Sequence, residues 1–311
     1  MPVHTLTHRL LNPAPDAPYR VEKVCIPAAG LGVPQTLIEH FKLPLQQAES
    51  LHQRVADAQQ PATFLIPRDW SGHSVLHIPG AGDNRHAFKW LLFRKLLDRN
   101  LAVLTVDPPG HGEFNSMPCT IDNAKRAAQN WSEWLHAQPN VKRVAAVGIS
   151  FGGCQAAHLT LTDPRIAALA TISTPVTLPP VTRRVIARES LTLMLPRNAL
   201  LLRYQSLRAM WAEWRDMTGA WFGEELYDMI EQFDMLNTIH AIGPRPTAFV
   251  HGKRDAAVPP SNSQRMFDAA LPERELMWVP SASHLSVVLY DKEMARLADW
   301  LKTSLLDRMT K

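Results

Sequence analysis

The sequence has little of what marks secreted, membrane-spanning or nucleic-acid-binding proteins. Cysteine occurs only three times in 311 residues, without paired spacing, so neither a disulfide framework nor a zinc site is indicated. Basic and acidic residues number 33 and 29, and no run of Lys or Arg is long enough to form a nucleic-acid-binding surface. No apolar run reaches the length of a membrane span, and residues 1–20 lack the apolar core of a signal peptide. We therefore expect a cytoplasmic protein with no membrane span, no nucleic-acid partner, no metal and no cofactor.

What the sequence does contain is a regular alternation of apolar strands and amphipathic helices. Runs rich in Val, Ile, Leu and Ala predict strands at residues 62–66, 73–78, 101–106, 143–147, 166–172, 247–250 and 275–279. Helices are expected between them, one capped by Asp83 or Asn84 and one by Thr120. Strands that alternate with helices form a parallel sheet covered on both faces. Since 46% of the residues are hydrophobic, the chain can fill one large core, and we expect an α/β fold with a mostly parallel, doubly wound sheet.

Residues 1–61 are the least regular part of the sequence. An alternating pattern predicts a strand at residues 19–27, a second strand is expected at 36–41, and helical spacing predicts a helix at 45–58. No combination of side chains there points to a reaction. We interpret this region as an N-terminal extension that packs on the core and covers the edge of the sheet.

A short turn at residues 148–152, with the sequence Gly-Ile-Ser-Phe-Gly, joins a predicted strand to a predicted helix. This pattern at such a junction is typical of a nucleophile elbow, a sharp turn that holds Ser150 in a strained conformation with its hydroxyl exposed. Only small residues fit two positions before and after that serine. A Gly- and Ser-rich loop can also match the pattern by accident, so the interpretation depends on partner residues elsewhere in the chain.

Two candidate partners for Ser150 follow other predicted strands. Asp255 lies in the loop after the strand at 247–250, and His284 lies in the loop after the strand at 275–279. The carboxyl ends of parallel strands meet at one edge of a sheet, which is where ligands bind. We therefore expect Ser150, Asp255 and His284 to lie close together. The alternatives are a solvated loop carboxylate for Asp255 and a capped loop histidine for His284.

A second glycine-rich turn, Pro-Gly-Ala-Gly at residues 79–82, follows the strand at 73–78. Glycines in this position leave backbone N–H groups facing a cavity, where they can hold an oxyanion. The alternative is an ordinary strand-to-helix turn. His111, in the Pro- and Gly-rich turn at 107–112, is interpreted as structural, and Cys154 as a core residue.

Taken together, these segments resemble the α/β-hydrolase fold family. The matching segments are residues 79–82, 107–112, 148–152, 251–255 and 283–284. In that family the nucleophile, the acid and the histidine follow one another in the order found here. The resemblance implies that Ser150 attacks a carbonyl carbon, that His284 takes up the serine proton, and that Asp255 orients the histidine.

The resemblance also implies an oxyanion hole made of two backbone N–H groups. One belongs to Phe151, and the other belongs to Ala81 or, as an alternative, to Gly82. The choice stays open because Pro79 precedes the first glycine, where many family members have a histidine.

Residues 176–242 interrupt the alternation of strands and helices. They contain helical segments and no convincing strand, and they lie where the family carries a cap, between core segments at 62–175 and 243–311. Opposite charges separate into the two halves of this region: Arg183, Arg184, Arg188, Arg197, Arg203 and Arg208 in the first, and Glu213, Asp216, Glu224, Glu225, Asp228, Glu231 and Asp234 in the second. We expect these two sets to pair and to hold cap helices together. The alternative is that the arginines bind an acidic group of the substrate.

These features predict a serine hydrolase that cleaves a carboxylic ester or a related acyl compound, with a small molecule as its substrate. The same triad serves peptidases, amidases and carbon–carbon bond hydrolases, which are therefore alternatives. A further alternative is a hydrolase-fold protein that binds a ligand without catalysis. No feature of the sequence indicates an oligomeric state.

Overall fold

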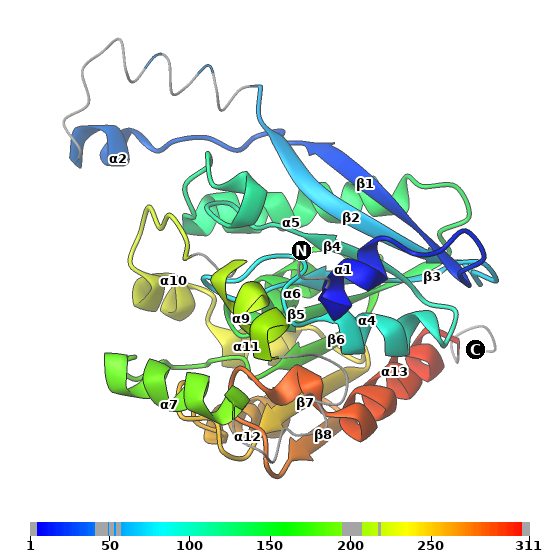
Figure 1. Ribbon diagram of the computed structural model, residues 1–311. Helices are drawn as coiled ribbons and strands as arrows, with labels where there is room; N and C mark the ends of the chain where they lie inside the picture. Colours follow the sequence, from blue (N-terminus) through cyan, green and yellow to red (C-terminus); the bar gives the residue numbers. More distant parts are fainter. Residues whose placement is uncertain are drawn as a thin grey trace.

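The computed structural model has an eight-stranded sheet at its centre, with helices on both faces (Figure 1). The structure describes residues 5–40, 49, 53, 57–194, 207–216 and 219–306. The strand order is β1-β2-β4-β3-β5-β6-β7-β8. Strand β2 runs antiparallel to both of its neighbours, whereas strands β3 to β8 are parallel to one another. The expected α/β fold with a mostly parallel, doubly wound sheet is confirmed.

The strands lie where the apolar runs predict them. They are β1 (Tyr19–Pro27), β2 (Gln59–Pro67), β3 (His73–Ile78), β4 (Ala102–Val106), β5 (Arg143–Ile149), β6 (Ile166–Ile172), β7 (Thr247–Gly252) and β8 (Arg274–Val279). Strands β3 and β4 are buried along their whole length, as expected for central strands covered on both faces. Side chains of each strand alternate between the two faces and therefore fill two separate hydrophobic layers.

Different helices cover the two faces of the sheet. Helices α4 (Trp90–Leu97) and α13 (Asp291–Leu306) pack on one face, together with the short α1 (Leu6–Leu11) and the 3₁₀ turn η3 (Val287–Leu289). Helices α5 (Ile121–His136), α6 (Phe151–Thr162), α11 (Met235–Ala241) and α12 (Ser261–Ala269) pack on the other. Further pieces are α7 (Arg183–Met194), α9 (Leu207–Asp216), α10 (Leu226–Gln232) and η1 (Gly112–Phe114). Among the described residues, no helix has the length and apolar character needed to cross a membrane.

The N-terminal region joins the sheet directly. Strand β1 pairs with β2 along its whole length and forms the sheet edge. The strand expected at 36–41 is wrong, because residues 35–40 form helix α2 (Gln35–His40). Val33, Leu37 and Ile38 recur at helical spacing, and they pack in one small hydrophobic cluster. The helix expected at 45–58 falls almost entirely outside the described residues.

The helix after β3 begins later than the capping pattern predicts. It starts at Trp90, because Asn84 accepts hydrogen bonds from the N–H groups of His86 and Ala87 and closes a turn instead. Phe88 then adopts a positive φ of 57°, which a helix does not allow. Residues 83–89 therefore form a loop that lies against the candidate site.

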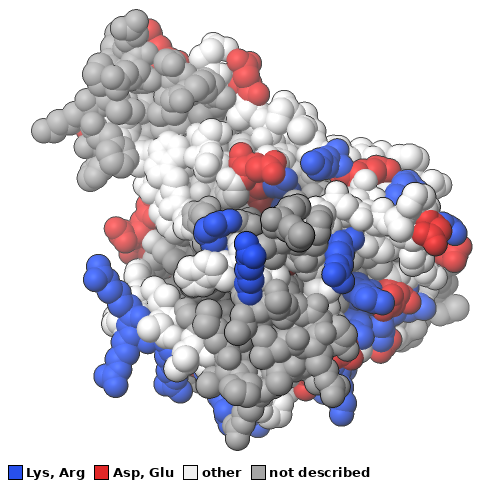
Figure 2. Space-filling view, in the orientation of Figure 1, with Lys and Arg blue, Asp and Glu red and all other residues white. Residues whose placement is uncertain are grey.

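The expected pairing of arginines with carboxylates between residues 176 and 242 is not found among the described residues, and Arg197 and Arg203 lie outside them. The arginines of the first half that the structure describes are exposed, and none forms an ion pair with a described acid: Arg183, Arg184, Arg188 and Arg208. Two of the carboxylates have other partners: Glu213 accepts from the N–H groups of Thr7 and Phe88, and Glu224 from that of Ile121. Figure 2 shows Lys and Arg side chains projecting into solvent at the left, where α7 lies in Figure 1. The division into extension, core and cap stays a prediction.

Candidate active site

Ser150 lies in a strained turn between β5 and α6. Its φ and ψ are 51° and −124°, a conformation that non-glycine residues adopt only where the surrounding structure enforces it. A Cβ atom at position 148 would lie 2.2 Å from the carbonyl oxygen of Gly152, and one at position 152 would lie 2.3 Å from that of Ile78. Both positions therefore require glycine, and the sequence has glycine at both, two residues before and two residues after Ser150.

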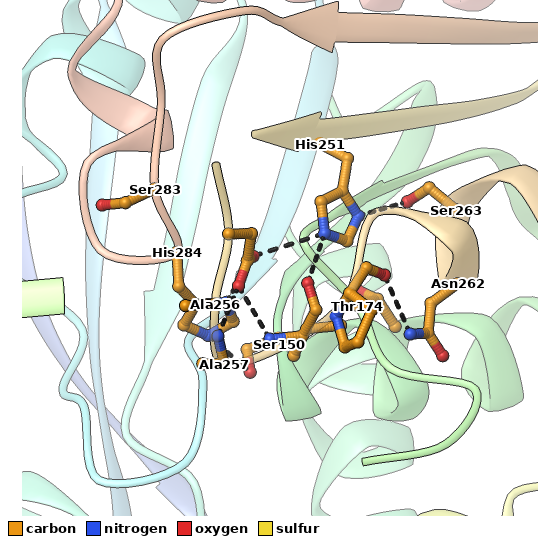
Figure 3. A network of polar contacts seen from close by, with 12 residues as sticks. Ser150, Thr174, His251, Ala256, Ala257, Asn262, Ser263, Ser283 and His284 are labelled. Atoms are coloured by element: carbon orange, nitrogen blue, oxygen red, sulfur yellow. Dashed lines mark hydrogen bonds and ion pairs between the residues drawn. The ribbon is translucent and has the colours of Figure 1, made fainter. Parts of the chain in front are cut away.

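The structure brings together the three side chains that the sequence singles out. His284 Nε2 lies 3.1 Å from Ser150 Oγ, and His284 Nδ1 lies 2.7 Å from Asp255 Oδ2 (Figure 3). Asp255 comes from the loop after β7 and His284 from the loop after β8, so parallel strands deliver all three to one sheet edge. The geometry permits a proton to pass from the serine hydroxyl to the imidazole while the carboxylate accepts from the opposite ring nitrogen.

The carboxylate of Asp255 is fixed by further hydrogen bonds. Its Oδ1 accepts from the N–H groups of Ala257 and Val258 at 3.0 and 2.7 Å, which leaves Oδ2 for His284. Burial raises the pKa of Asp255, but the charge of His284 and the hydrogen bonds of His251 and His284 outweigh burial, and the net pKa lies well below its ordinary value. Asp255 therefore stays ionised and can stabilise an imidazolium ion.

His251 is a residue of this network that the sequence alone does not reveal. Its Nε2 lies 3.3 Å from Asp255 Oδ2 and 3.0 Å from the carbonyl oxygen of Val258. Both of these atoms are acceptors, so Nε2 carries a proton, while Nδ1 meets Ser263 Oγ at 2.7 Å. His251 thus contacts the same carboxylate oxygen that His284 contacts.

The pKa of His284 is set by three carboxylates on three different elements. Burial lowers the pKa of His284, but the charges of Asp255, Glu189 and Asp83 and the hydrogen bond with Asp255 outweigh burial, so the pKa lies above its ordinary 6.5. A general base works only while it is neutral, and a raised pKa keeps it protonated up to a higher pH.

We therefore expect the acid limb of kcat/KM to lie above pH 6.5 and not at the value of free histidine. The measurement is kcat/KM for a non-ionising ester from about pH 5 to 9. An acid limb below the ordinary histidine value would contradict the proposed charge environment.

Helix α7 contacts both loops that carry the acid and the base. Glu189 Oε1 accepts from the N–H of Ala256 at 2.8 Å, and Thr192 donates to Ser283 Oγ at 2.6 Å. Glu189 is buried, and its Oε2 has no hydrogen-bond partner among the described residues. The sequence signal for this role is weak but present, because Glu189 is the only acid among the arginines of its half of residues 176–242.

Replacing Glu189 by Gln keeps an oxygen that can accept from Ala256 N–H but removes a negative charge near His284. We expect the acid limb of kcat/KM to move to lower pH by up to about one pH unit. Glu189→Ala also removes the hydrogen bond and should lower kcat about tenfold or more. Glu213→Gln is the control for loss of a buried carboxylate, since Glu213 is also buried and its charge is not among those that raise the pKa of His284. An acid limb that stays in place in Glu189→Gln would refute the assignment.

A small cavity of about 70 Å³ opens beside Ser150 and His284. Ala81 lines it, and the N–H of Phe151 has no partner within its own helix because Phe151 is the first residue of α6. Neither N–H donates to an atom in the described part of the chain. Gly82, the alternative donor, has a positive φ of 75° in the same turn. Their role as oxyanion donors stays a prediction.

Three other residues with reactive side chains have contacts or burial that indicate a structural role. Asp107 is buried in an ion pair with Arg85 and accepts from the N–H of Glu113, and no contact joins it to His284. His111 meets the carbonyl oxygen of Pro109 at 2.8 Å. Burial raises the pKa of the Cys154 thiol well above its ordinary value, which removes the thiolate that a cysteine nucleophile needs.

Comparison with known proteins places the chain in a family. The alpha/beta hydrolase family matches residues 75–300, most of the chain, and the protein therefore belongs to the alpha/beta hydrolase family. No curated protein sequence matches it.

Several solved structures share the fold at low sequence identity. The esterase domain of a Rhodothermus marinus protein is 14% identical, with a TM-score of 0.55 over 91% of this chain and 97% of that one. The monoacylglycerol lipase of Paleococcus ferrophilus is 19% identical, with a TM-score of 0.56 over 76% and 96%. An esterase of Pyrococcus furiosus is also 19% identical, with a TM-score of 0.55 over 79% and 89%. At these identities the likeness is one of fold.

Proposed function

We propose that this protein is a serine hydrolase that cleaves a small carboxylic ester through an acyl-enzyme on Ser150. The observation that carries the proposal is the pair of contacts at His284, 3.1 Å to Ser150 and 2.7 Å to Asp255, beside a cavity. A serine hydroxyl becomes a useful nucleophile when an adjacent base accepts its proton, and this arrangement meets that need.

The reaction then follows from the positions of the three groups. Ser150 Oγ bonds to the carbonyl carbon while its proton passes to His284 Nε2. Asp255 stabilises the resulting imidazolium, and the N–H groups of Phe151 and Ala81 (or Gly82) hold the oxyanion, each such donor being worth about 2.7–4 kcal/mol. His284 returns the proton to the departing alcohol. Water attacks the acyl-enzyme in the same way, with His284 as base, and releases the acid.

Ester hydrolysis is favoured over the other reactions of this triad by the named activities of similar structures. Two of the three structures described above are an esterase domain and an esterase, and the third is a monoacylglycerol lipase. A strained Ser150 in hydrogen-bonding distance of His284 argues against a purely ligand-binding role, because strain of this kind has a cost that binding alone does not need.

We also propose that the helical region around α7 acts as a cap that selects the substrate. The support is the contact of α7 with the loops of Asp255 and His284, through Ala256 and Ser283. A neutral acyl group is favoured over an anionic one, because three carboxylates act on His284.

The test is a panel of p-nitrophenyl esters of graded acyl length, set beside aminoacyl p-nitroanilides. We expect saturable hydrolysis of the esters and little or no hydrolysis of the anilides. Faster turnover of the anilides would favour a peptidase or amidase. Absence of turnover with every substrate would favour the binding role.

A further inference from the structure

A buried ion pair forms part of the wall of the cavity beside Ser150, and the triad makes no use of its cation. Lys89 Nζ lies 2.5 Å from Asp83 Oδ2, and only 2% of the Lys89 side chain is exposed. Both residues line the cavity, whose other side chains are mainly apolar: Ala81, Ala87, Phe88, Ile149, Leu285 and Val288. Lysine is almost never buried this deeply without a partner or a function.

One of the three N–H donors of the Lys89 ammonium group has no hydrogen-bond partner among the described residues. An ammonium group has three N–H donors and no acceptor. One bonds to Asp83 Oδ2 at 2.5 Å and another to the carbonyl oxygen of Ala87 at 2.6 Å. No described residue accepts the third. The other oxygen of Asp83 is also occupied, since Oδ1 accepts from the N–H of Asn84 at 2.8 Å.

An ion pair of this kind is poor evidence for stability alone. The free energy needed to remove two charges from water is about as large as the free energy gained from their attraction. Apolar residues of the same volume therefore often give a protein of equal stability. Lys89 does, however, place a charged hydrogen-bond donor in the wall of a cavity whose lining is mainly apolar. Such a donor favours binding of a ligand that has a hydrogen-bond acceptor, because a ligand without one leaves the buried N–H unpaired.

We propose that Lys89 is a specificity-determining residue, which donates its third N–H to a neutral oxygen in the short arm of the substrate that enters this cavity. The inference rests on the proposed ester hydrolysis at Ser150. The oxygen is an ether, hydroxyl or carbonyl and not a carboxylate, because Asp83 already neutralises Lys89, and Asp255 and Glu189 act on the same site. The arm is short, since a cavity of about 70 Å³ accommodates only a few water-sized groups.

The experiment compares esters that differ by one atom. Pentanoyl, ethoxyacetyl and 3-methoxypropanoyl esters of p-nitrophenol have equal length, and an ether oxygen replaces one methylene in the last two. Acetates of butanol and 2-methoxyethanol make the same comparison on the alcohol side. A succinyl monoester supplies the carboxylate. Each kcat/KM is divided by the rate of spontaneous alkaline hydrolysis, which removes the inductive effect of the oxygen.

For the wild-type enzyme we expect the corrected kcat/KM of at least one oxygen-bearing ester to exceed that of its hydrocarbon match about tenfold. The corrected kcat/KM of the succinyl ester should not exceed that of the pentanoyl ester. In Lys89→Met this ratio should fall to about one. The double variant Asp83→Asn/Lys89→Met removes both charges together and should behave in the same way, which guards against unfolding by an unpaired buried carboxylate. Lys95→Met is the matched control, because Lys95 of α4 pairs with Asp291 of α13 and does not line this cavity. Its ratio should equal that of the wild type.

A wild-type ratio near one on both sides of the ester overturns the inference, whether or not the variants fold, and leaves the proposed function intact. A ratio that survives in both Lys89 variants overturns it as well, as does a preference for the succinyl ester that Lys89→Met abolishes. If the wild-type enzyme hydrolyses none of the esters, the proposed function fails and this inference fails with it.

Discussion

Replacing Ser150 by Ala should lower kcat for the best ester about 10⁶-fold and leave the fold unchanged. Among the described residues, the Ser150 hydroxyl is the only group within hydrogen-bonding distance of His284 Nε2 that the proposed reaction can use as a nucleophile. Alanine also avoids any new clash, because it removes a single atom from the elbow. The measurement is single-turnover and steady-state hydrolysis, with thermal unfolding to check the fold.

Ser173 provides a matched control for this variant. It is buried, it has a similar positive φ of 48°, and it follows the end of the neighbouring strand β6. No described residue bonds to its hydroxyl. Ser173→Ala should therefore retain activity within a few-fold, so that a general effect of alanine at a strained serine can be separated from loss of the nucleophile. Equal activity of Ser150→Ala and the wild type would exclude Ser150 from the reaction.

Replacing Asp255 by Asn should lower kcat about 10⁴-fold. Asparagine has nearly the same shape, and its oxygen can still accept from the N–H groups of Ala257 and Val258. Its amide group then donates to Nδ1 of His284, which leaves the proton on the nitrogen that must accept from Ser150. The charge that stabilises the imidazolium is also lost.

The acid limb of the kcat/KM profile distinguishes loss of the Asp255 charge from simple misfolding of the variant. Loss of the Asp255 charge should lower the pKa of His284, so any residual kcat/KM should persist to lower pH than in the wild type. Asp107→Asn tests the rival assignment. Asp107 pairs with Arg85, so its replacement should affect stability more than the acid limb. Near-full activity of Asp255→Asn, together with an inactive but folded Asp107→Asn, would make Asp107 the acid.

Much of the sheet can be predicted from local sequence. The strand expected at residues 73–78 matches β3 because an unbroken apolar run is what a strand buried on both faces requires. The three residues of the proposed triad follow from one rule, that parallel strands end at the same edge. Ser150 is also marked by its neighbours, since the glycines at 148 and 152 are dictated by contacts of less than 3 Å.

The errors arise where a short pattern fits two structures. Residues 36–41 are apolar enough for a strand, but Pro34 and the helical spacing of Val33 and Leu37 decide for helix α2. Asn84 fits a helix cap as well as a turn, and it makes the turn. Helix α2 also packs in one cluster with Phe114 and Met117, which are distant in the sequence, whereas the hydrogen bonds that fix the turn at Asn84 are local.

Contacts across the chain are what the sequence conceals. Glu189 and Ala256 are 67 residues apart, and the local sequence around either residue does not predict their hydrogen bond. Lys89 looks like an ordinary helix residue until the fold buries its ammonium group beside Ser150. The separation of charge between residues 176 and 242 suggests pairing. The described arginines of its first half nevertheless face solvent, and Glu213 and Glu224 of its second half bind backbone N–H groups.

Covalent labelling by a fluorophosphonate, followed by peptide mass mapping, tests the central claim most directly. The reagent needs an activated serine beside an oxyanion site, and it makes no assumption about the substrate. The account predicts one adduct per chain, on Ser150, that is lost in Ser150→Ala and formed more slowly as pH falls through the raised pKa of His284. An unlabelled but folded protein, or an adduct on Cys154, would contradict it.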